Sequence, residues 1–273
     1  MIEKHSRSFI GWLVFIPLQT LWVPISMLGA IMVGYRQLIV SKRIGVSQTA
    51  VEVFNARWTL SLFDLRTDLA GDALGRVLTN TSTRGLFLAL FPLWVKWKIA
   101  GKVSLYPRNV AQGDEGLVDI ITARTTYFDT VILRQASHVE QFVVLGAGYD
   151  TRSYGPLFDS GTNIFEVDQA SVQEHKKAML SRSVIDTSRV TFVTVDFSQD
   201  DLFAHLKANG FDATKPTLFL WEGVTLYLTE EMVRKSMADI HENAAEGSVL
   251  LADIYALRFI HMAQGKYLDK VLK

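Results

Sequence analysis

Apolar and polar positions divide this chain into three patterns. The first is an uncharged, mostly apolar run from Ser8 to Tyr35. The second covers residues 48–80 and 116–134, where apolar side chains recur at three- and four-residue steps, as in amphipathic helices. Gly71 and Gly75 weaken the first of these stretches, and a division into two helices is expected there. The third begins at residue 142 and alternates short apolar runs with helical stretches. Strands that alternate with helices predict a parallel sheet with helices on both faces.

The third pattern predicts strands at Phe142–Leu145, Asn163–Val167, Val190–Val195, Thr217–Trp221 and Ser248–Asp253. The predicted fold class is α/β: a Rossmann-like, doubly wound, mostly parallel sheet with an N-terminal helical cap and a hydrophobic membrane-anchor helix. We expect three parts, namely a membrane anchor over 1–45, a helical cap region over 46–135 and a ligand-binding Rossmann-like domain over 136–273.

The run from Ser8 to Tyr35 predicts a membrane anchor. A helix of roughly 27 residues is about 40 Å long, which is enough to cross a hydrocarbon core of about 30 Å with tilt. Pro17 and Pro24 each remove a backbone donor, so a kink or two shorter helices is expected. A cleaved signal peptide is a poorer interpretation because the apolar region is too long, and a buried core helix rarely runs this far without a polar face.

Basic residues flank the anchor on both sides. Arg36, Lys42 and Arg43 outweigh Lys4 and Arg7, so the positive-inside tendency predicts a membrane-associated protein whose C-terminal domain faces the cytoplasm. A second apolar run, GLFLALFPLWVKWKIA over 85–100, is too short to span a membrane and contains a proline. Two interpretations stay open for it: a helix in the headgroup layer, or a core helix of the cap region.

Composition excludes several classes of function. Lys+Arg and Asp+Glu both number 28, so the protein has no net field to attract nucleic acid. Cysteine is absent, which removes disulfides, thiolate zinc sites and cysteine nucleophiles. No clustered metal ligands and no Gly-x-Ser-x-Gly elbow of a hydrolase occur in the sequence.

The candidate chemistry gathers where predicted strands end. The first strand runs into Gly146 and Gly148, whose missing side chains let backbone approach a ligand. Asp168, Asp196 and Glu222 each follow an apolar strand at its C-terminal end. In an open α/β sheet that edge is where ligands bind. Three carboxylates there suit a ligand that donates hydroxyl and amine hydrogens, such as a ribose, an adenine and an ammonium group, and they would repel a pyrophosphate.

With these residues in view, the chain resembles a class I S-adenosylmethionine-dependent methyltransferase, and more narrowly the bacterial O-methyltransferase branch of the leucine carboxyl methyltransferase family. The resemblance runs from about Thr49 to Tyr255. It depends on the segments TAVEVFNARW, GLVDIITARTTYFD, QFVVLGAGYDTR, FEVDQ, VTFVTVDF and FLWEGVTLYLTEEMV, in this order. The N-terminal membrane stretch is an addition to the usual family pattern.

The resemblance implies S-adenosyl-L-methionine as cofactor and assigns its binding to Arg124, Gly146, Gly148, Asp168, Asp196, Phe197 and Glu222. Arg124 would pair with the methionine carboxylate. Asp168 would bind the ribose hydroxyls, and Glu222 would face the methionine amino group. Asp196 and Phe197 would hold the adenine. No metal is implied.

The resemblance further implies methyl transfer to an oxygen of a small or membrane-associated acceptor. A carboxylate acceptor needs no general base, whereas a hydroxyl does, and the histidines lie on predicted helices or linkers. We therefore favour carboxyl methylation. The catalytic residues are unknown; Tyr227 and Arg152, near strand ends, are weak candidates for orienting the acceptor.

Two other functions stay open at this point. The protein could be a membrane-tethered cofactor-binding or interaction protein without turnover, because only Ala256–Lys273 follow the last predicted strand and the C-terminal strand pair usual in class I methyltransferases is expected to be missing. A partner, such as a second copy in a homo-oligomer, could then cover the sheet edge. An NAD(P)-dependent oxidoreductase is disfavoured because Thr151 replaces the third glycine of Gly-x-Gly-x-x-Gly.

Overall fold

The computed structural model describes residues 2–101, 111, 114 and 116–255, and it divides into two compact units, Met1–Tyr127 and Phe128–Lys273. The sequence YPRNVAQGDE over 106–115 is polar and predicts a loop, but most of it, and everything after Tyr255, lie outside the described residues. Each unit is described by itself.

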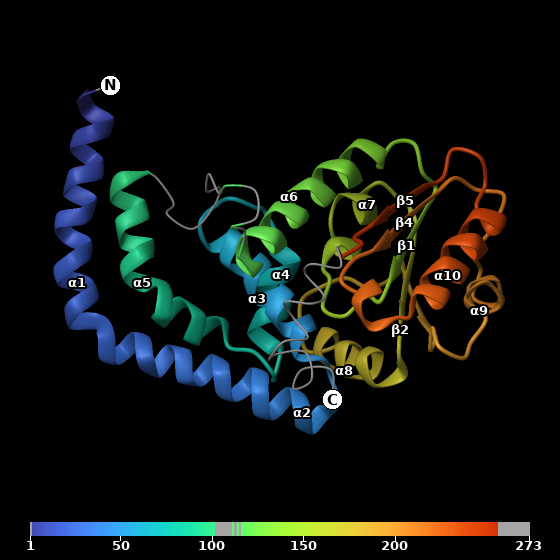
Figure 1. Ribbon diagram of the computed structural model, residues 1–273, viewed down its shortest axis with the longest axis horizontal. Helices are drawn as coiled ribbons and strands as arrows, with labels where there is room; N and C mark the ends of the chain where they lie inside the picture. The colour runs from blue at the N-terminus through green and yellow to red at the C-terminus, as the bar shows by residue number, and fades with distance from the viewer. Residues whose placement is uncertain (1, 102–110, 112–113, 115, 256–273) are drawn as a thin grey trace. The chain divides into compact units, whose positions relative to one another are not determined.

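The C-terminal unit contains the predicted sheet (Figure 1). Within the described residues its strands are β1 (Gln141–Leu145), β2 (Asn163–Asp168), β3 (Val190–Thr194), β4 (Thr217–Trp221) and β5 (Val249–Ala252), in the order β3-β2-β1-β4-β5. Every neighbouring pair is parallel. The α/β fold class and the position of every predicted strand are therefore confirmed.

Alternate residues of the strands face two separate cores. On one face, Val143 and Leu145 pack with Phe203 of α9 (Leu202–Ala208) and Ile240 of α10 (Glu230–Asn243). On the other face, a second cluster joins the strands to α6 (Leu117–Gln135) and α7 (Pro156–Asp159). All side chains of β1 and β4 are buried, because a parallel sheet covered on both sides leaves neither face to solvent. The remaining long helix of this unit is α8 (Ala170–Leu180).

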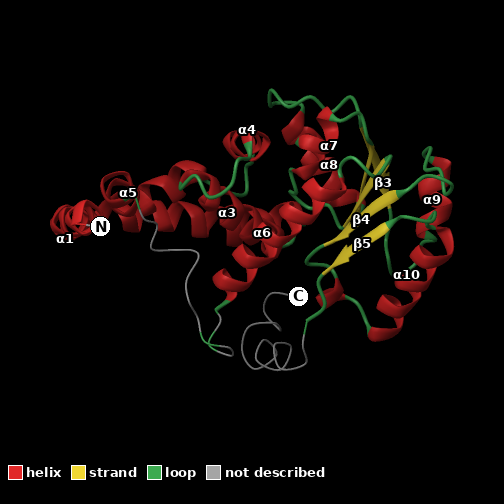
Figure 2. Cartoon of the chain, turned by 90° about the horizontal axis from the view of Figure 1, so that it is seen from above, coloured by secondary structure: helices red, strands yellow, loops and turns green. Residues whose placement is uncertain are grey.

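The N-terminal unit is helical (Figure 2). It comprises α1 (Ile2–Tyr35), a π-helical turn (Arg36–Val40), α2 (Ser41–Ile44), α3 (Gln48–Leu62), α4 (Leu69–Val77), α5 (Thr83–Ala100) and the first part of α6. By length and composition, residues 8–44 could cross a membrane, and only 6% of the most apolar window is buried. Although Pro17 and Pro24 lie inside it, α1 is one continuous helix rather than two separate ones.

The helix predicted over residues 48–80 is interrupted earlier than its glycines suggested. The interruption falls between Leu62 and Leu69, where Asp64 has a positive φ of 53°. Asp68 then accepts a hydrogen bond from the Gly71 backbone N–H at 2.7 Å and caps α4. A side chain at Gly71 would collide with that carboxylate, so this glycine serves the cap rather than dividing the helix.

Candidate functional site

Three of the predicted site residues lie level with one another at the C-terminal edge of the sheet. Leu145 of β1 pairs with Val167 of β2 and with Trp221 of β4. The next residues along the three strands are Gly146, Asp168 and Glu222. Because adjacent strands are about 4.8 Å apart, the two acids flank the glycine with a backbone separation of about 10 Å.

The glycine turn is tied to the end of β2. The backbone N–H groups of Gly146 and Ala147 donate to the Val167 carbonyl at 2.8 and 3.0 Å. Gly146 has a φ of +70° and Gly148 a φ of +45°, a backbone region that favours glycine. A Cβ atom on Gly146 would lie 2.2 Å from Cγ2 of Val224, so the space beside it is already filled. This position therefore requires glycine for two independent reasons.

Asp168 connects the turn to the strand edge. Its Oδ2 accepts the Gly148 N–H and its Oδ1 accepts the Gln169 N–H, both at 2.7 Å. Burial raises the pKa of this carboxyl, and the two backbone donors oppose that rise. A carboxylate offers about four acceptor positions, so two hydrogen bonds leave capacity for the hydroxyls of a ligand.

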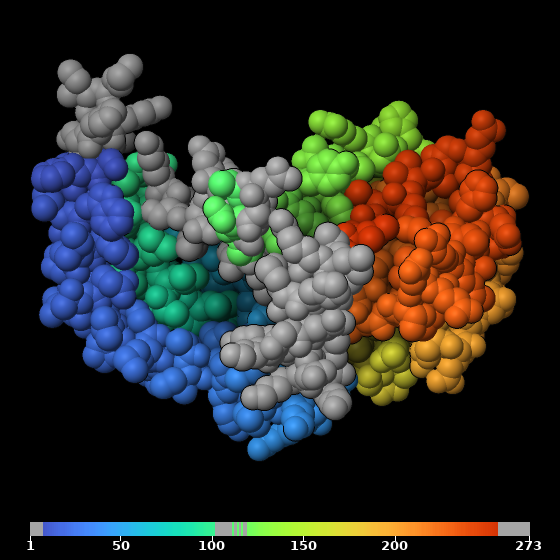
Figure 3. All heavy atoms as spheres, viewed as in Figure 1, coloured from blue at the N-terminus to red at the C-terminus, as the bar shows by residue number. Residues whose placement is uncertain are grey.

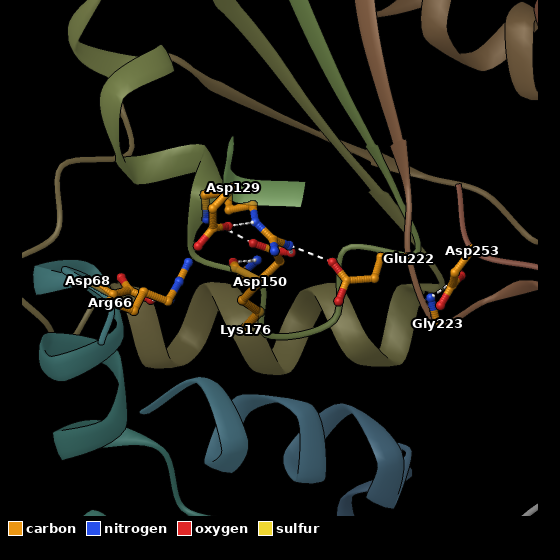
Figure 4. Close-up of polar contacts among 9 residues, drawn as sticks. Arg66, Asp68, Asp129, Asp150, Lys176, Glu222, Gly223 and Asp253 are labelled. Carbon is orange, nitrogen blue, oxygen red and sulfur yellow. Dashed lines mark hydrogen bonds and ion pairs between the residues drawn. The ribbon is translucent and has the colours of Figure 1, made fainter. Parts of the chain in front are cut away.

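Arg152 joins three carboxylates from different parts of the unit (Figure 4). Its Nε donates to Asp129 of α6 at 2.6 Å, and its Nη1 contacts Asp150 at 2.8 Å and Glu222 at 2.6 Å. The arginine side chain is only 4% exposed. Burial acts to lower the pKa of Arg152, but Asp150, Glu222 and Asp129 together raise it well above its usual value. Three carboxylates from separate parts of the unit thus converge on one guanidinium at this edge.

A second contact fixes the turn that follows Glu222. Asp253, directly after β5, accepts the Gly223 N–H at 2.9 Å, and its carbonyl accepts the Thr225 hydroxyl at 2.7 Å. Glu222 is therefore held through its side chain by Arg152 and through the following backbone by the end of the neighbouring strand. Such double support fixes the orientation of the Glu222 carboxylate.

Asp196 and Phe197 lie beyond β3, one strand further along the sheet. The Asp196 carboxylate accepts the backbone N–H and the hydroxyl of Ser198 at 2.9 and 2.6 Å. These two hydrogen bonds lower its pKa. Phe197 is partly buried and packs against the core under the sheet. Asp196 is thus an ionised acid on an internally bonded loop.

A buried ion pair holds the loop that follows the two glycines. Lys176 of α8 pairs with Glu166 of β2 at 2.7 Å, with both side chains 1% exposed. The same ammonium donates to the Asp150 carbonyl at 2.8 Å. Burial raises the pKa of Glu166 despite the lysine, and burial followed by Glu166 raises the pKa of Tyr154.

Three other residues were predicted from the sequence to act at the site, and the roles assigned to them stay predictions. Arg124 lies on α6 within the N-terminal unit, so its assignment to the methionine carboxylate stays a prediction. Tyr227 ends a short 3-10 turn (Thr225–Tyr227) after β4 and is 40% exposed. Arg152 is enclosed by carboxylates, and its suggested contact with an acceptor also stays a prediction.

Sequence reasoning did not identify Asp129, Asp150, Lys176 or Asp253 as site residues. A buried arginine requires anions, which is the signal that could have drawn attention to the acids near Arg152. Nothing in the local pattern could have identified Lys176, because its partners belong to a strand and a loop that precede it in the chain.

Comparisons with known proteins identify the family of this chain. Residues 50–241 match the family model described as leucine carboxyl methyltransferase. A proposed S-adenosyl-L-methionine-dependent methyltransferase of Mycolicibacterium smegmatis is 36% identical over 147 residues, which are 53% of this chain and 47% of that protein. Another from Mycobacterium avium is 29% identical over 215 residues, 78% of this chain and 67% of that one.

A solved structure of a proposed methyltransferase from Thermobifida fusca is 16% identical, covers 78% of this chain and 73% of its own, and has a TM-score of 0.42. The chain spans about half to two thirds of the length of the curated relatives it matches.

Proposed function

The chain belongs to the leucine carboxyl methyltransferase family, and we propose that it transfers a methyl group from S-adenosyl-L-methionine to an oxygen of a small or membrane-associated acceptor. In this proposal the acceptor atom is an oxygen of a carboxylate or a hydroxyl group, and α1 attaches the enzyme to a membrane. The acceptor class follows from the apolar N-terminal helix, which favours a substrate in or near the lipid phase.

The observation that carries the proposal is the alignment of Gly146, Asp168 and Glu222 at one sheet edge, with Gly148 bonded to Asp168. This edge lies outside the carboxyl ends of parallel strands, where α/β folds bind their ligands. The Gly148 backbone is in direct contact with one of these acids, Asp168. A ligand that carries both a ribose and an amino group can meet both acids at once.

The donor set fits the cofactor chemically. S-adenosyl-L-methionine carries two cationic groups, a sulfonium and an ammonium, and one carboxylate. Asp129, Asp150 and Glu222 converge on Arg152, and Asp168 lies at the same sheet edge. Carboxylates at this edge suit a cationic ligand and would repel the pyrophosphate of a dinucleotide. Asp168 would bind the ribose and Glu222 the ammonium, with Asp196 and Phe197 at the adenine.

When bound, the cofactor supplies an electrophilic methyl group, so the protein has to supply alignment and a dry site. Arg152 orients Glu222 through their ion pair, and Asp253 fixes the backbone after it. A carboxylate acceptor is already ionised at neutral pH and needs no base. Tyr227, half exposed beyond β4, is the candidate for orienting that acceptor.

Calorimetric titration with S-adenosylhomocysteine tests the cofactor assignment. Wild type should bind, NAD should give no heat, and Asp168→Asn should lower affinity roughly 10- to 150-fold, because a hydrogen bond to a charged group contributes about 1.5–3 kcal/mol. Asp186→Asn is the matched control, since Asp186 is an exposed loop acid bonded to the Ser188 N–H. Equal affinity of both variants would refute the role of Asp168.

Turnover is tested separately with radiolabelled cofactor and a membrane extract, using wild type, Asp168→Asn and Arg124→Ala. Label in wild type that is lost in both variants supports transfer, and its lability to mild base distinguishes a carboxyl ester from an ether. Binding without any transfer of label would favour the alternative, a tethered cofactor-binding protein.

A further inference from the structure

Two apolar helices of the N-terminal unit lie side by side along most of their length (Figure 3). Three contacts define their direction. The Trp22 indole donates to the Leu88 carbonyl at 3.0 Å, and the Ser26 hydroxyl to the Ala89 carbonyl at 3.4 Å. The Lys96 ammonium lies 3.3 Å from the centre of the Trp12 ring. Positions 88 and 89 of α5 thus meet positions 22 and 26 of α1, whereas position 96 meets position 12, so the helices are antiparallel overall.

The uncharged parts of the two helices coincide. In α1 no residue from Ser8 to Tyr35 is charged, and in α5 none from Gly85 to Val95. The antiparallel alignment places the shorter uncharged run entirely beside the longer one. Basic residues stand at both ends: Arg36 and Arg84 at one end, Lys96 and Lys98 at the other. Arg36 and Arg84 stand together at one end of the pair, where cationic side chains suit one polar border of a bilayer.

Glycines bring the two backbones into contact. A Cβ atom on Gly29 would lie 2.5 Å from the Gly85 carbonyl oxygen, and one on Gly85 would lie 2.8 Å from the Gly29 carbonyl oxygen. Close packing of small residues is how helices associate in lipid, where the hydrophobic effect between helices is absent. Gly34, also in α1, has nothing within 4 Å of its Cβ position and takes no part in the contact.

The proline in α5 gives the strongest argument. Pro92 has no N–H, so the carbonyl of Leu88, four residues earlier, lacks its helical donor. The Trp22 indole of α1 supplies that donor. Inside a bilayer no water can do so, and proline is tolerated in membrane helices where a neighbouring helix satisfies the freed carbonyl. Figure 1 shows α1 changing direction part-way along, with α5 following beside it.

The faces of α1 that do not contact α5 carry large, solvent-exposed apolar side chains. Leu13, Leu21, Leu28 and Ile31 are each more than half exposed, with Leu21 reaching 79%. An apolar surface this continuous marks a membrane or protein contact. Uncharged length, a basic end and the internally satisfied backbone all favour lipid.

We propose that α1 and α5 enter the lipid bilayer together, as one antiparallel pair. The uncharged run of α5 is about 16 Å long, roughly half of a hydrocarbon core of about 30 Å, so α5 does not cross alone. It is held in the membrane by its contact with α1. This inference rests on the proposed membrane attachment through α1 and extends it, because α5 then belongs to the membrane-embedded part rather than to a water-soluble helical cap.

The absence of cysteine makes the test direct, since every introduced thiol is unique. Leu90→Cys in α5, Leu21→Cys in α1 and Val184→Cys, 94% exposed in the C-terminal unit, are each labelled with an environment-sensitive fluorophore in the full chain. The labelled proteins are reconstituted into phosphatidylcholine–phosphatidylglycerol vesicles with and without doxyl-labelled acyl chains. We expect blue-shifted, doxyl-quenched emission at positions 21 and 90 and neither effect at 184.

Each departure has a defined meaning. Quenching at 21 without quenching at 90 would leave α1 as an anchor and overturn the paired insertion. Blue-shifted emission at 90 without doxyl quenching would mean that protein, such as a second copy of this chain, covers the helix, and would overturn it as well. Quenching at neither position would overturn both the anchor and the pair. Binding of S-adenosylhomocysteine, measured on the same samples, reports separately on the proposed function.

The pairing itself is tested by a cross-link and by a matched glycine series. A Cβ on Gly11 would lie 3.0 Å from the Ala100 Cβ, so the double variant Gly11→Cys with Ala100→Cys should form a disulfide in vesicles. Gly29→Ala should lower the yield of that cross-link several-fold, whereas Gly34→Ala should leave it unchanged. Absence of the cross-link in vesicles, or equal effects of the two glycine variants, would refute the close-packed pair.

Discussion

Replacement of Arg152 by methionine is the sharpest test of the charge arrangement at the sheet edge. Methionine fills much of the same space but carries no charge. The variant leaves Asp129, Asp150 and Glu222 near one another without the guanidinium that joins them. We expect a loss of stability and, because Glu222 loses its orientation, weaker binding of S-adenosylhomocysteine.

The magnitude follows from the contacts. Three charge-assisted hydrogen bonds at about 1.5–3 kcal/mol each would sum to roughly 5–9 kcal/mol. Part of this is offset because the buried guanidinium no longer has to be desolvated. Removing one partner of a buried ionic group costs about 3–5 kcal/mol, which is the expected loss of unfolding free energy at pH 7. The midpoint of thermal unfolding should fall by roughly 6–20 °C.

The loss should depend on pH in a defined direction. Without the arginine, the three carboxylates repel one another in a site with little solvent, and protonation relieves that repulsion. The deficit in unfolding free energy is therefore present at neutral pH and shrinks as the pH falls toward about 4. Urea unfolding at pH 7 and pH 5, followed by circular dichroism, should therefore show the larger deficit at pH 7.

Arg234→Met is the matched control. Arg234 pairs with Glu230 four residues earlier on α10, and both side chains are more than three quarters exposed. An exposed pair of this kind contributes about 0–1 kcal/mol. If Arg152→Met were no more destabilising than Arg234→Met, or if its deficit did not change with pH, the interpretation of Arg152 as the charge that organises the site would be wrong.

Three further predictions test other parts of the site. In urea unfolding, Gly146→Ala should destabilise the protein more than Gly210→Ala. Both glycines have a positive φ, where alanine costs about 1–2 kcal/mol, but only at position 146 does the added methyl group clash, at a cost of about 1–3 kcal/mol. Equal losses of unfolding free energy would contradict this prediction. Lys176→Met should lower the unfolding free energy by about 3–5 kcal/mol, because it leaves the buried Glu166 without its lysine. The double variant with Glu166→Gln should recover most of this loss, because it removes both charges of the pair. Additive losses in a double-mutant cycle would contradict the pairing. Burial raises the pKa of Asp168, so its ionisation costs folding stability as the pH rises through that pKa. The stability of Asp168→Asn relative to wild type should therefore improve between about pH 4 and pH 7, and a constant difference in unfolding free energy would refute the shift.

Much of the fold could be predicted from the order of residues. A run such as Phe142–Leu145, apolar at every position, has to be buried on both faces, and only a covered parallel sheet offers that environment to a short strand. The helical stretches between such runs then fix the connectivity. Asp168 and Glu222 could also be identified, because an acid directly after a buried strand lies at the edge where that strand ends.

The ends of the helices were harder to predict from the sequence. The interruption at 63–68 arises because Asp68 can cap α4 and Asp64 adopts a left-handed conformation, whereas the local pattern drew attention to Gly71. Capping competes with helix continuation by about 1 kcal/mol, a margin that periodicity alone cannot resolve.

Contacts between distant residues were decided by the tertiary structure alone. The partners of Arg152 lie 2, 23 and 70 residues away in the sequence, and the freed carbonyl of Leu88 meets a tryptophan 66 residues earlier. Each residue type was visible in the sequence, as a charge or an indole that needs a partner. Which partner it finds depends on how the sheet and the helix pair bring separate segments together, and no local spacing contains that information.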